Sequence, residues 1–205
     1  MKGSRIVAEL TERSITSGNF VFTPTSIEGV MAVDVKTYGD RRGYFMETYR
    51  RDNFVVAGID AEFVQDNQSS SSQGVLRGLH FQIAHPQAKL VRVIRGTVFD
   101  VAVDLRVGSP TWGKWEGIVL SEENHRQFFV PRGFAHGFLV LSDEAEFCYK
   151  CDDTYHPGDE GGVMWNDPEI GIVWPAFLGE KNFDPARVIL SDKDKVHPPL
   201  FALKN

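Results

Sequence analysis

The sequence predicts an all-β domain built as a sandwich or a barrel. Many short stretches of alternating apolar and polar residues recur at turn spacings of about ten residues, as they do in such folds. Glycine is abundant (19 residues), and 15 phenylalanines supply large apolar side chains, which suits strands joined by tight turns. The chain of 205 residues shows no linker and no internal break. We therefore expect a single domain over residues 1–205.

The N-terminal part predicts an extension followed by a strand. Residues 1–25 have no clear periodicity and are interpreted as an extension or an edge strand that docks on a partner. Alternation over residues 27–38 predicts a strand, with Met31, Val33 and Val35 on one face. Gly39-Asp40 predicts the turn that ends it.

The next stretch alternates between predicted strands and irregular segments. Residues 42–47 predict the start of a strand, and residues 49–58 predict one short helix. Residues 63–67 predict a strand with a polar end. The serine run at residues 69–72 favours a flexible loop.

The central stretch, residues 74–106, carries the residues on which the functional reading depends. A sheet predicted from its two alternating runs holds Arg77, His80 and Lys89, a cationic cluster suited to binding an anion and transferring a proton. Arg77 and His80 are an odd number of positions apart and would face opposite ways on a regular strand. A bulge or bend at Gly78 could bring them together.

The second run of this stretch and the residues after it predict further strands. Asp100, Ala102, Asp104 and Arg106 fall on one face of a strand. Residues 112–120 resume the alternation, and residues 138–141 and 145–150 predict a hairpin. Beyond residue 152 the periodicity fades, and a short helix is expected near Pro185 or Asp192.

Charge and composition narrow the classes of function. The net charge of −6 argues against non-specific nucleic-acid binding. No apolar run reaches membrane-spanning length, and the first twenty residues lack the apolar core of a signal peptide, so we expect a cytoplasmic protein without a membrane partner. Cys148 and Cys151 form a C-x-x-C on a predicted strand, where positions three apart face opposite ways, which argues against a redox or zinc pair.

A metal site is the weaker reading of the histidines. The residues from Pro131 to His136 resemble the second half of the metal-binding signature of the cupin superfamily. The first half is incomplete, because His80-Phe81-Gln82 lacks the second histidine and no glutamate precedes Lys89. Two ligands are then missing, and Lys89 and Arg77 would repel a cation, so we expect no metal and no cofactor.

Several motifs in order resemble the dTDP-4-dehydrorhamnose 3,5-epimerase family, from about residue 30 to residue 195. They are Arg42-Gly43-x-Phe45-x-Glu47, Gln65-Asp66-Asn67, GVLRGLHFQ, Lys89-Leu90-Val91-Arg92, VFDVAVDLR, PRGFAHGFLVLSDEAEF, Tyr149-Lys150 and WNDPEIGIVWP. The resemblance implies a cupin-type double-stranded β-helix (jelly roll) with a few short peripheral helices. It also implies a homodimer that needs neither metal nor organic cofactor and acts in dTDP-L-rhamnose biosynthesis.

The resemblance also implies a role for each matching residue. His80 would accept a proton, Tyr149 would donate one, Asp194 would orient His80, and Lys89 would stabilise an enolate at the C4 carbonyl of the sugar. Arg77 and Arg42 would hold the diphosphate, with Arg42 reaching from the other subunit. The remaining substrate-binding residues would contact the nucleotide or line the pocket: Glu47, Gln65, Asp66, Asn67, Tyr155, His136, Glu160 and Lys193.

The chemistry supports such a reaction on its own terms, and it leaves alternatives open. A 4-keto group acidifies the hydrogens at both C3 and C5, so one lysine can serve both steps, and inversion needs a base and an acid on opposite faces of the sugar. The alternatives are an epimerase acting at C3 or C5 alone, a metal-dependent cupin isomerase or oxygenase, and a non-catalytic module that binds sugar nucleotides.

Overall fold

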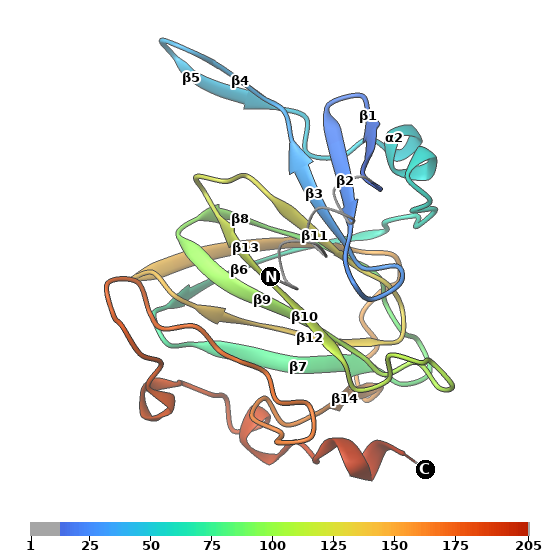
Figure 1. Ribbon diagram of the computed structural model, residues 1–205, viewed down its shortest axis with the longest axis vertical. Helices are drawn as coiled ribbons and strands as arrows, with labels where there is room; N and C mark the ends of the chain where they lie inside the picture. The colour runs from blue at the N-terminus through green and yellow to red at the C-terminus, as the bar shows by residue number, and fades with distance from the viewer. Residues whose placement is uncertain (1–12, 205) are drawn as a thin grey trace, which may run out of the picture.

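The computed structural model describes residues 13–204 and is built mainly from β-strands (Figure 1). The strands are β1 (Ile15–Ser17), β2 (Phe20–Pro24), β3 (Met31–Val35), β4 (Thr37–Asp40), β5 (Gly43–Met46), β6 (Gln65–Ser72), β7 (Leu76–Gln82), β8 (Lys89–Arg95), β9 (Thr97–Asp104), β10 (Trp115–Ser121), β11 (Gln127–Val130), β12 (Phe134–Val140), β13 (Glu144–Cys151) and β14 (Glu160–Gly162). The helices are α2 (Arg51–Val56) and the 3-10 turns η1 (Pro185–Arg187), η2 (Asp194–Val196) and η3 (Leu200–Leu203). The all-β prediction is confirmed.

Two sheets face each other with the strand order of a jelly roll. One has seven strands in the order β1-β2-β3-β11-β8-β13-β6, and the other has five in the order β10-β9-β12-β7-β14. The eight strands β6 to β13 divide into two sets of four, β11-β8-β13-β6 in the large sheet and β10-β9-β12-β7 in the small one. This arrangement confirms the double-stranded β-helix implied by the family resemblance.

The space between the sheets is filled by branched and aromatic side chains. Val91, Val98, Phe128, Phe138 and Phe147 belong to this core and are at most 4% exposed. The alternating pattern of the sequence places such residues on the inner face of each strand.

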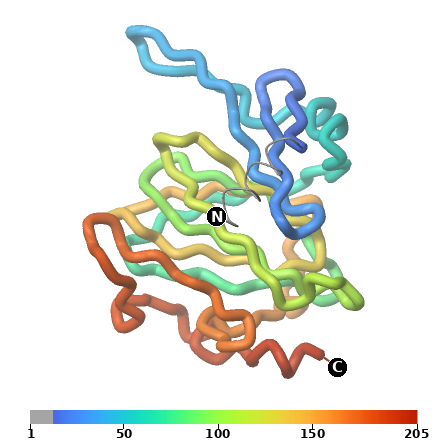
Figure 2. The backbone as a smooth tube through the Cα atoms, viewed as in Figure 1, coloured from blue at the N-terminus to red at the C-terminus, as the bar shows by residue number. Residues whose placement is uncertain are grey.

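The segment that follows β14 covers the outer face of the five-stranded sheet. Residues after β14 run below β7 and β9, as the orange and red tube in Figure 2 shows. Ile170, Trp174, Phe177 and Leu200 pack there against residues of that sheet. One short helix was expected near Pro185 or Asp192, and the structure has a 3-10 turn at each place, η1 and η2, of which η2 contacts β7. No helix within residues 13–204 is long and apolar enough to cross a membrane.

The N-terminal region forms a hairpin on the large sheet and an arm that leaves it. β1 and β2 pair with each other, and β2 pairs with β3, so β1 is an edge strand of the large sheet. Residues 1–12 lie outside the described residues. The β4–β5 hairpin extends away from the body (Figure 1). The short helix α2 lies within the predicted residues 49–58 and packs Phe54 against Phe20 and Phe22.

The hairpin predicted from residues 138–141 and 145–150 is wrong, because β12 and β13 belong to different sheets. Two further local predictions are also wrong. The serine run at residues 69–72 is the second half of β6, which pairs with β13 over its full length from Gln65–Cys151 to Ser72–Glu144. Gly39-Asp40 does not turn, because both residues belong to β4 and the turn follows at residues 41–42. In both places a strand of weak propensity is stabilised by hydrogen bonds to a neighbouring strand, which composition does not reveal.

Candidate active site

A bulge in β7 brings two of the predicted site residues to the same cavity. His136 on β12 pairs with His80, but Phe138 pairs with Arg77, so two residues of β7 oppose the single residue Gly137. Gly78 adopts a φ of 131°, and a Cβ placed on it would lie 2.6 Å from the Gly137 Cα. The bulge predicted at Gly78 is therefore confirmed, and Arg77 and His80 both face the interior cavity.

The site consists of two adjoining cavities at one end of the sandwich. The inner cavity has a volume of about 480 Å³ and includes Arg77, His136, Lys193 and Asp194 among its lining residues. The outer cavity has a volume of about 250 Å³, and Gln65, Asn67, Tyr155 and Glu160 contribute to its walls. Three residues line both cavities: His80, Lys89 and Tyr149.

His80 is held by a carboxylate from the C-terminal segment. Its Nε2 lies 2.5 Å from Oδ1 of Asp194, whose side chain is 4% exposed. His197 Nε2 lies 3.3 Å from the same oxygen. Burial acts to raise the pKa of Asp194, but the hydrogen bond and charge of His80 and the hydrogen bond of Ser191 outweigh it and lower the pKa. An Nε2 proton shared with this carboxylate leaves Nδ1 of His80 with a free lone pair, as a general base requires.

Lys89 and Tyr149 come from adjacent strands of the large sheet, β8 and β13. Burial lowers the pKa of the Lys89 ammonium group, and the charges of Cys151, Asp100 and Glu160 oppose that shift. Burial raises the pKa of the Tyr149 phenol, as does the charge of Cys151, while Arg77 opposes both. Tyr149 is therefore protonated at neutral pH and is available as a proton donor.

His136 points into the inner cavity and is tied to a buried carboxylate behind it. Its Nε2 lies 2.9 Å and 3.0 Å from the two oxygens of Asp100, a residue with no exposed surface. Burial raises the pKa of Asp100, and the charge and hydrogen bond of His136 and the charge of Lys89 oppose this. The pair lies on the central strands β9 and β12, so its position is fixed by the sheet.

The outer cavity presents hydrogen-bonding groups around one exposed aromatic ring. Gln65 donates from Nε2 to Asn67 Oδ1 over 3.0 Å and accepts at Oε1 from the Tyr155 backbone N–H over 2.8 Å. The Tyr155 residue is 49% exposed. Glu160 and Lys193 form an ion pair beside it. A site with a flat ring, amide groups and a cavity beyond them can hold a base at one end and a sugar at the other.

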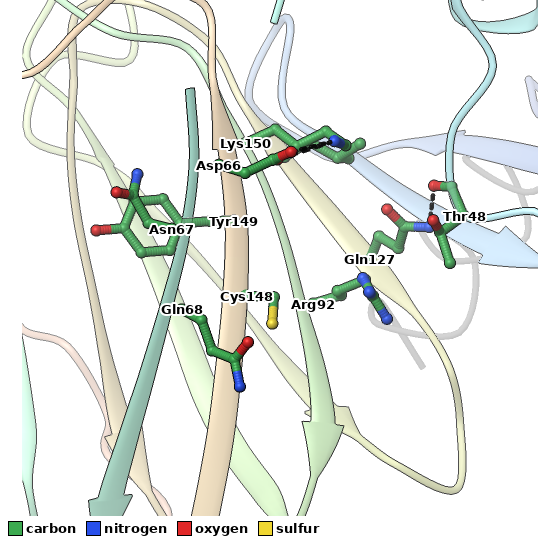
Figure 3. A pocket seen from close by; sticks show the side chains of 10 residues that line it. Thr48, Asp66, Asn67, Gln68, Arg92, Gln127, Cys148, Tyr149 and Lys150 are labelled. Carbon is green, nitrogen blue, oxygen red and sulfur yellow. Dashed lines mark hydrogen bonds and ion pairs between the residues drawn. The ribbon is translucent and has the colours of Figure 1, made fainter. Parts of the chain in front are cut away.

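Three predicted substrate-binding residues do not reach these cavities within the chain. Asp66 pairs with Lys150 on the opposite face of the sheet, 2.8 Å from its Nζ (Figure 3). This corrects the prediction for Asp66, because it points the opposite way from its strand neighbours Gln65 and Asn67. Arg42 sits at the tip of the β4–β5 arm and binds Asp40, and Glu47 accepts a hydrogen bond from Asn19 at the base of the arm.

The two cysteines of the C-x-x-C motif lie on opposite faces of the large sheet, and Figure 3 shows the face that carries Cys148. Cys148 lies among Arg92, Gln127 and Lys150, whereas Cys151 is buried and lines the outer cavity. Both thiols are free. Burial raises the pKa of Cys151 to about 11, so the thiol is neutral beside Lys89 at physiological pH. The prediction that the two cysteines face opposite ways is confirmed.

Sequence reasoning missed two residues of the site. His197 lies in a segment without periodicity, and nothing in its neighbourhood distinguishes it from a surface histidine. Asp100 was seen only as part of one face of a strand. The signal that could have singled it out is a carboxylate inside a strand whose other residues are almost all apolar, the pattern of a strand buried on both faces.

The donor set allows a test of the metal reading. Ligand atoms of His80, Asp194 and His197 lie within 4.8 Å of one another, so these residues offer a cation three donors. His136, the histidine of the cupin-like signature, is instead bound to Asp100. Lys89 and Arg77 line the same cavity, and their positive charges disfavour a cation there.

Comparison with known proteins gives a consistent result over most of the chain. The family model for dTDP-4-dehydrorhamnose 3,5-epimerase matches residues 24–201. The dTDP-4-dehydrorhamnose 3,5-epimerase of Methanothermobacter thermautotrophicus is 52% identical over 181 residues, which cover 88% of this chain and 95% of the relative. The dTDP-4-dehydrorhamnose 3-epimerase of Streptomyces niveus is 47% identical over 154 residues, 74% of each chain.

A solved structure shares both sequence and fold. The crystal structure of dTDP-6-deoxy-D-glucose-3,5-epimerase from Legionella pneumophila Philadelphia 1, in complex with dTDP-4-keto-L-rhamnose, superposes with a TM-score of 0.81 at 49% identity. The match covers 88% of this chain and 92% of that chain. The family model, the identity to these relatives and the shared fold show that the chain belongs to the dTDP-4-dehydrorhamnose 3,5-epimerase family.

Proposed function

We propose that this chain epimerises dTDP-4-dehydro-6-deoxy-D-glucose at C3 and C5 to give dTDP-4-dehydro-L-rhamnose. The observation that carries the proposal is that His80, Lys89 and Tyr149 line both cavities, at the junction between a space for a sugar and a space for a nucleotide. They supply a base, an enolate-stabilising cation and an acid, the three groups that inversion beside a ketone needs.

In the proposed mechanism His80 removes the proton from the carbon next to the C4 carbonyl. The electron pair moves onto the C4 oxygen, where the Lys89 ammonium group stabilises the resulting enolate. Tyr149 then donates its proton to the same carbon from the opposite face, and the ketone forms again with inverted configuration. The phenolate takes up a proton from water and His80 releases one to water, so no redox partner is needed.

The same three groups can act on both carbons, because the C3 and C5 carbanions delocalise onto the same C4 oxygen. The sugar would turn between the two steps so that each carbon in turn meets His80 and Tyr149. The inner cavity of about 480 Å³ is large enough to allow this movement for one hexose.

The outer cavity is proposed to hold the thymidine diphosphate. Tyr155 would stack on the base, while Gln65 and Asn67 would offer hydrogen bonds to it. Arg77 donates from Nε to Ser71 over 3.1 Å, which fixes the guanidinium at the edge of the inner cavity, where it can bind phosphate oxygens.

The active form is proposed to be a homodimer in which the β4–β5 arm reaches the partner's site. The arm carries exposed aromatic residues, with Tyr44 58% and Phe45 69% exposed, and the side chain of Arg42 at its tip is 84% exposed. Such a surface is characteristic of a protein interface. A two-fold dimer would place each Arg42 at the other subunit's diphosphate. The proposal includes the cytoplasmic location expected from the sequence.

The test is deuterium incorporation from heavy water during reaction with dTDP-4-dehydro-6-deoxy-D-glucose. Nuclear magnetic resonance of the product should show deuterium at both C3 and C5 with inverted configuration at both carbons. Exchange at one carbon alone would restrict the activity to a single-site epimerase, as in the relative from Streptomyces niveus. Folded protein that produces no exchange would reject the proposal and favour a non-catalytic binding module.

A metal-dependent reaction is the second candidate, favoured by the cluster of His80, Asp194 and His197. Elemental analysis of protein purified without chelator, together with activity before and after dialysis against a chelator, separates the two. Stoichiometric iron, nickel or zinc that is required for turnover would support the metal reading. Full activity after chelation would support proton transfer by His80 and Tyr149.

A further inference from the structure

His197 is a buried histidine that lies beside the carboxylate of the proposed base pair. Its side chain is 8% exposed, and its Nε2 lies 3.3 Å from Oδ1 of Asp194. The same oxygen lies 2.5 Å from Nε2 of His80. The rings of His80 and His197 meet edge to face, with their centroids 5.4 Å apart. Two imidazoles therefore converge on one carboxylate oxygen.

The local backbone places His197 next to Asp194. Asp194 begins the 3-10 turn η2, and His197 follows its last residue, three positions later. Side chains at this spacing lie above one another in a 3-10 turn, which has three residues per turn. The backbone N–H of Asp194 donates to Ser191 Oγ over 3.1 Å, and this bond anchors the start of the turn.

The adjacent strand leaves room for the imidazole. Gly162 on β14 pairs with His80 on β7. A Cβ placed on Gly162 would lie 2.2 to 2.5 Å from three atoms of the His197 ring, so a side chain at position 162 would push the ring away. The ring is enclosed between this strand and Asp194, and packing therefore determines where its Nε2 lies.

Packing alone does not explain why this buried position holds a histidine. Among residues 13–204, Nε2 of His197 has no aligned hydrogen-bond partner, although Oδ1 of Asp194 is within reach. A buried N–H without a partner costs stability, and an apolar side chain of similar size would avoid that cost. Burial and the charge of His80 lower the pKa of His197, while Asp194 opposes both, so the ring is neutral at pH 7 and has one N–H to donate.

We propose that His197 is a positioning residue for the reaction: its Nε2–H donates to Oδ1 of Asp194 and holds this carboxylate in the direction that orients His80. A carboxylate that accepts from a second N–H has less freedom to turn about its side-chain bonds. The fixed carboxylate keeps the His80 proton on Nε2 and the lone pair on Nδ1, as a general base requires. The inference rests on the proposed function for its catalytic meaning, whereas the contact itself does not depend on it.

His197→Leu tests the proposal, because it removes the N–H and keeps an apolar side chain of similar size. Its kcat should fall by about 10- to 100-fold, since displacing a reacting group by about 1 Å can cost this much, while the affinity for dTDP should change little. His197→Gln puts an amide N–H near the place of Nε2 and should recover most of the lost kcat. A merely structural role predicts the reverse order, because leucine suits a buried position better than glutamine. Val196→Ala, which changes a residue of the same turn that is 78% exposed, should leave kcat unchanged.

A double-mutant cycle shows whether the effect passes through Asp194. In an Asp194→Asn background, His197→Leu should lower kcat further by about twofold at most, because the anion that His197 positions is already gone. A loss in this background as large as the loss in the wild-type background would overturn the proposal.

A measurement without substrate separates this inference from the proposed function. Protein labelled with ¹⁵N-histidine shows by nuclear magnetic resonance which ring nitrogen carries the proton, and the His80 signals are assigned by their loss in His80→Asn. Wild type and His197→Gln should hold the His80 proton on Nε2, and His197→Leu should show a larger share of the Nδ1–H tautomer. The same tautomer in all three would overturn the inference, whether or not the protein is active. If His197→Leu does not fold, the wild-type spectrum still decides, since a His197 proton on Nδ1 instead of Nε2 would overturn it.

Discussion

His80 and Asp194 are separated by 114 residues in the sequence, yet Nε2 of one lies 2.5 Å from Oδ1 of the other. The histidine belongs to β7, an inner strand of the five-stranded sheet, whereas the aspartate begins the 3-10 turn η2 in the segment that covers the sheet. The base and the group that orients it are thus supplied by separate parts of the fold. Their contact depends on the C-terminal segment being docked.

Asp194→Asn should reduce kcat by about 10²-fold or more while the affinity for dTDP changes little, because the variant removes the anion that orients His80 without touching the nucleotide cavity. Steady-state kinetics and dTDP titration calorimetry measure the two effects. Asp192→Asn is the matched control, since Asp192 lies two residues away and is bound to Lys195 at the surface. A loss of dTDP affinity as large as the loss of kcat would contradict this assignment.

The same variant should reveal how Asp194 contributes to stability. Folding lowers the pKa of this carboxyl, so its contribution is complete above the ordinary carboxyl pKa and disappears as the pH falls through the lowered folded-state pKa. Urea unfolding of wild type and Asp194→Asn should therefore differ at pH 6 and converge in strong acid. A difference that grows on acidification would contradict the predicted sign.

Tyr149→Phe should separate proton removal from inversion. The variant keeps His80 and Lys89 but lacks the phenol, so protons can leave and return only on the His80 face. We expect product formation to fall by about 10²- to 10⁴-fold while deuterium still enters the recovered substrate. Mass spectrometry of substrate and product measures both. Product formation at the wild-type rate would rule out Tyr149 as the donor.

Mixing two inactive variants tests the role of the arm. Arg42→Ala removes the guanidinium group at the tip of the β4–β5 hairpin, and His80→Asn removes the proposed general base. If each site combines the arm of one subunit with the cavity of the other, reassorted dimers should recover about a quarter of wild-type activity, because half are mixed and each mixed dimer has one intact site. Each variant alone, taken through the same dissociation and reassembly, is the control. No recovery from demonstrably mixed dimers would place Arg42 outside the partner's site.

Gly137→Ala should destabilise the sheet at the bulge. A Cβ on Gly137 would lie 2.6 Å from the Arg77 carbonyl oxygen and 2.9 Å from a Leu79 methyl group. Forcing these apart should cost about 1–3 kcal/mol in the free energy of unfolding and should also lower kcat, since Arg77 and His80 flank the bulge. Gly39→Ala, whose Cβ would meet only one atom at 3.8 Å, should leave both unchanged. Chemical denaturation and kinetics on both variants provide the comparison.

The sequence predicted a strand correctly where the strand's own residues show the alternating pattern. It missed a strand where only pairing with an adjacent strand makes the segment extended. β9 was expected because its residues fall on two alternating faces. The bulge in β7 was expected because Arg77 and His80 are three positions apart, so they can face the same cavity only if the strand is irregular at Gly78. The serine-rich half of β6 carries no such pattern, and its strand character comes from pairing with β13.

The same distinction holds for the site. Arg77, His80 and Lys89 are close in sequence, so their clustering could be predicted from one stretch. Asp194 was placed by family resemblance alone, since it lies after a long aperiodic segment. Asp66 was placed wrongly because a run of matching motif residues says nothing about the alternation of side chains within it.

All the jelly-roll strands, β6 to β13, precede the C-terminal segment in chain order. A nascent chain leaving the ribosome can therefore complete its sandwich while Asp194 is still in the exit tunnel or not yet synthesised. Until the segment docks, His80 lacks its orienting anion and the inner cavity lacks one wall. The sandwich would thus be folded but inactive at this stage, and activity would appear only when the C-terminal segment docks.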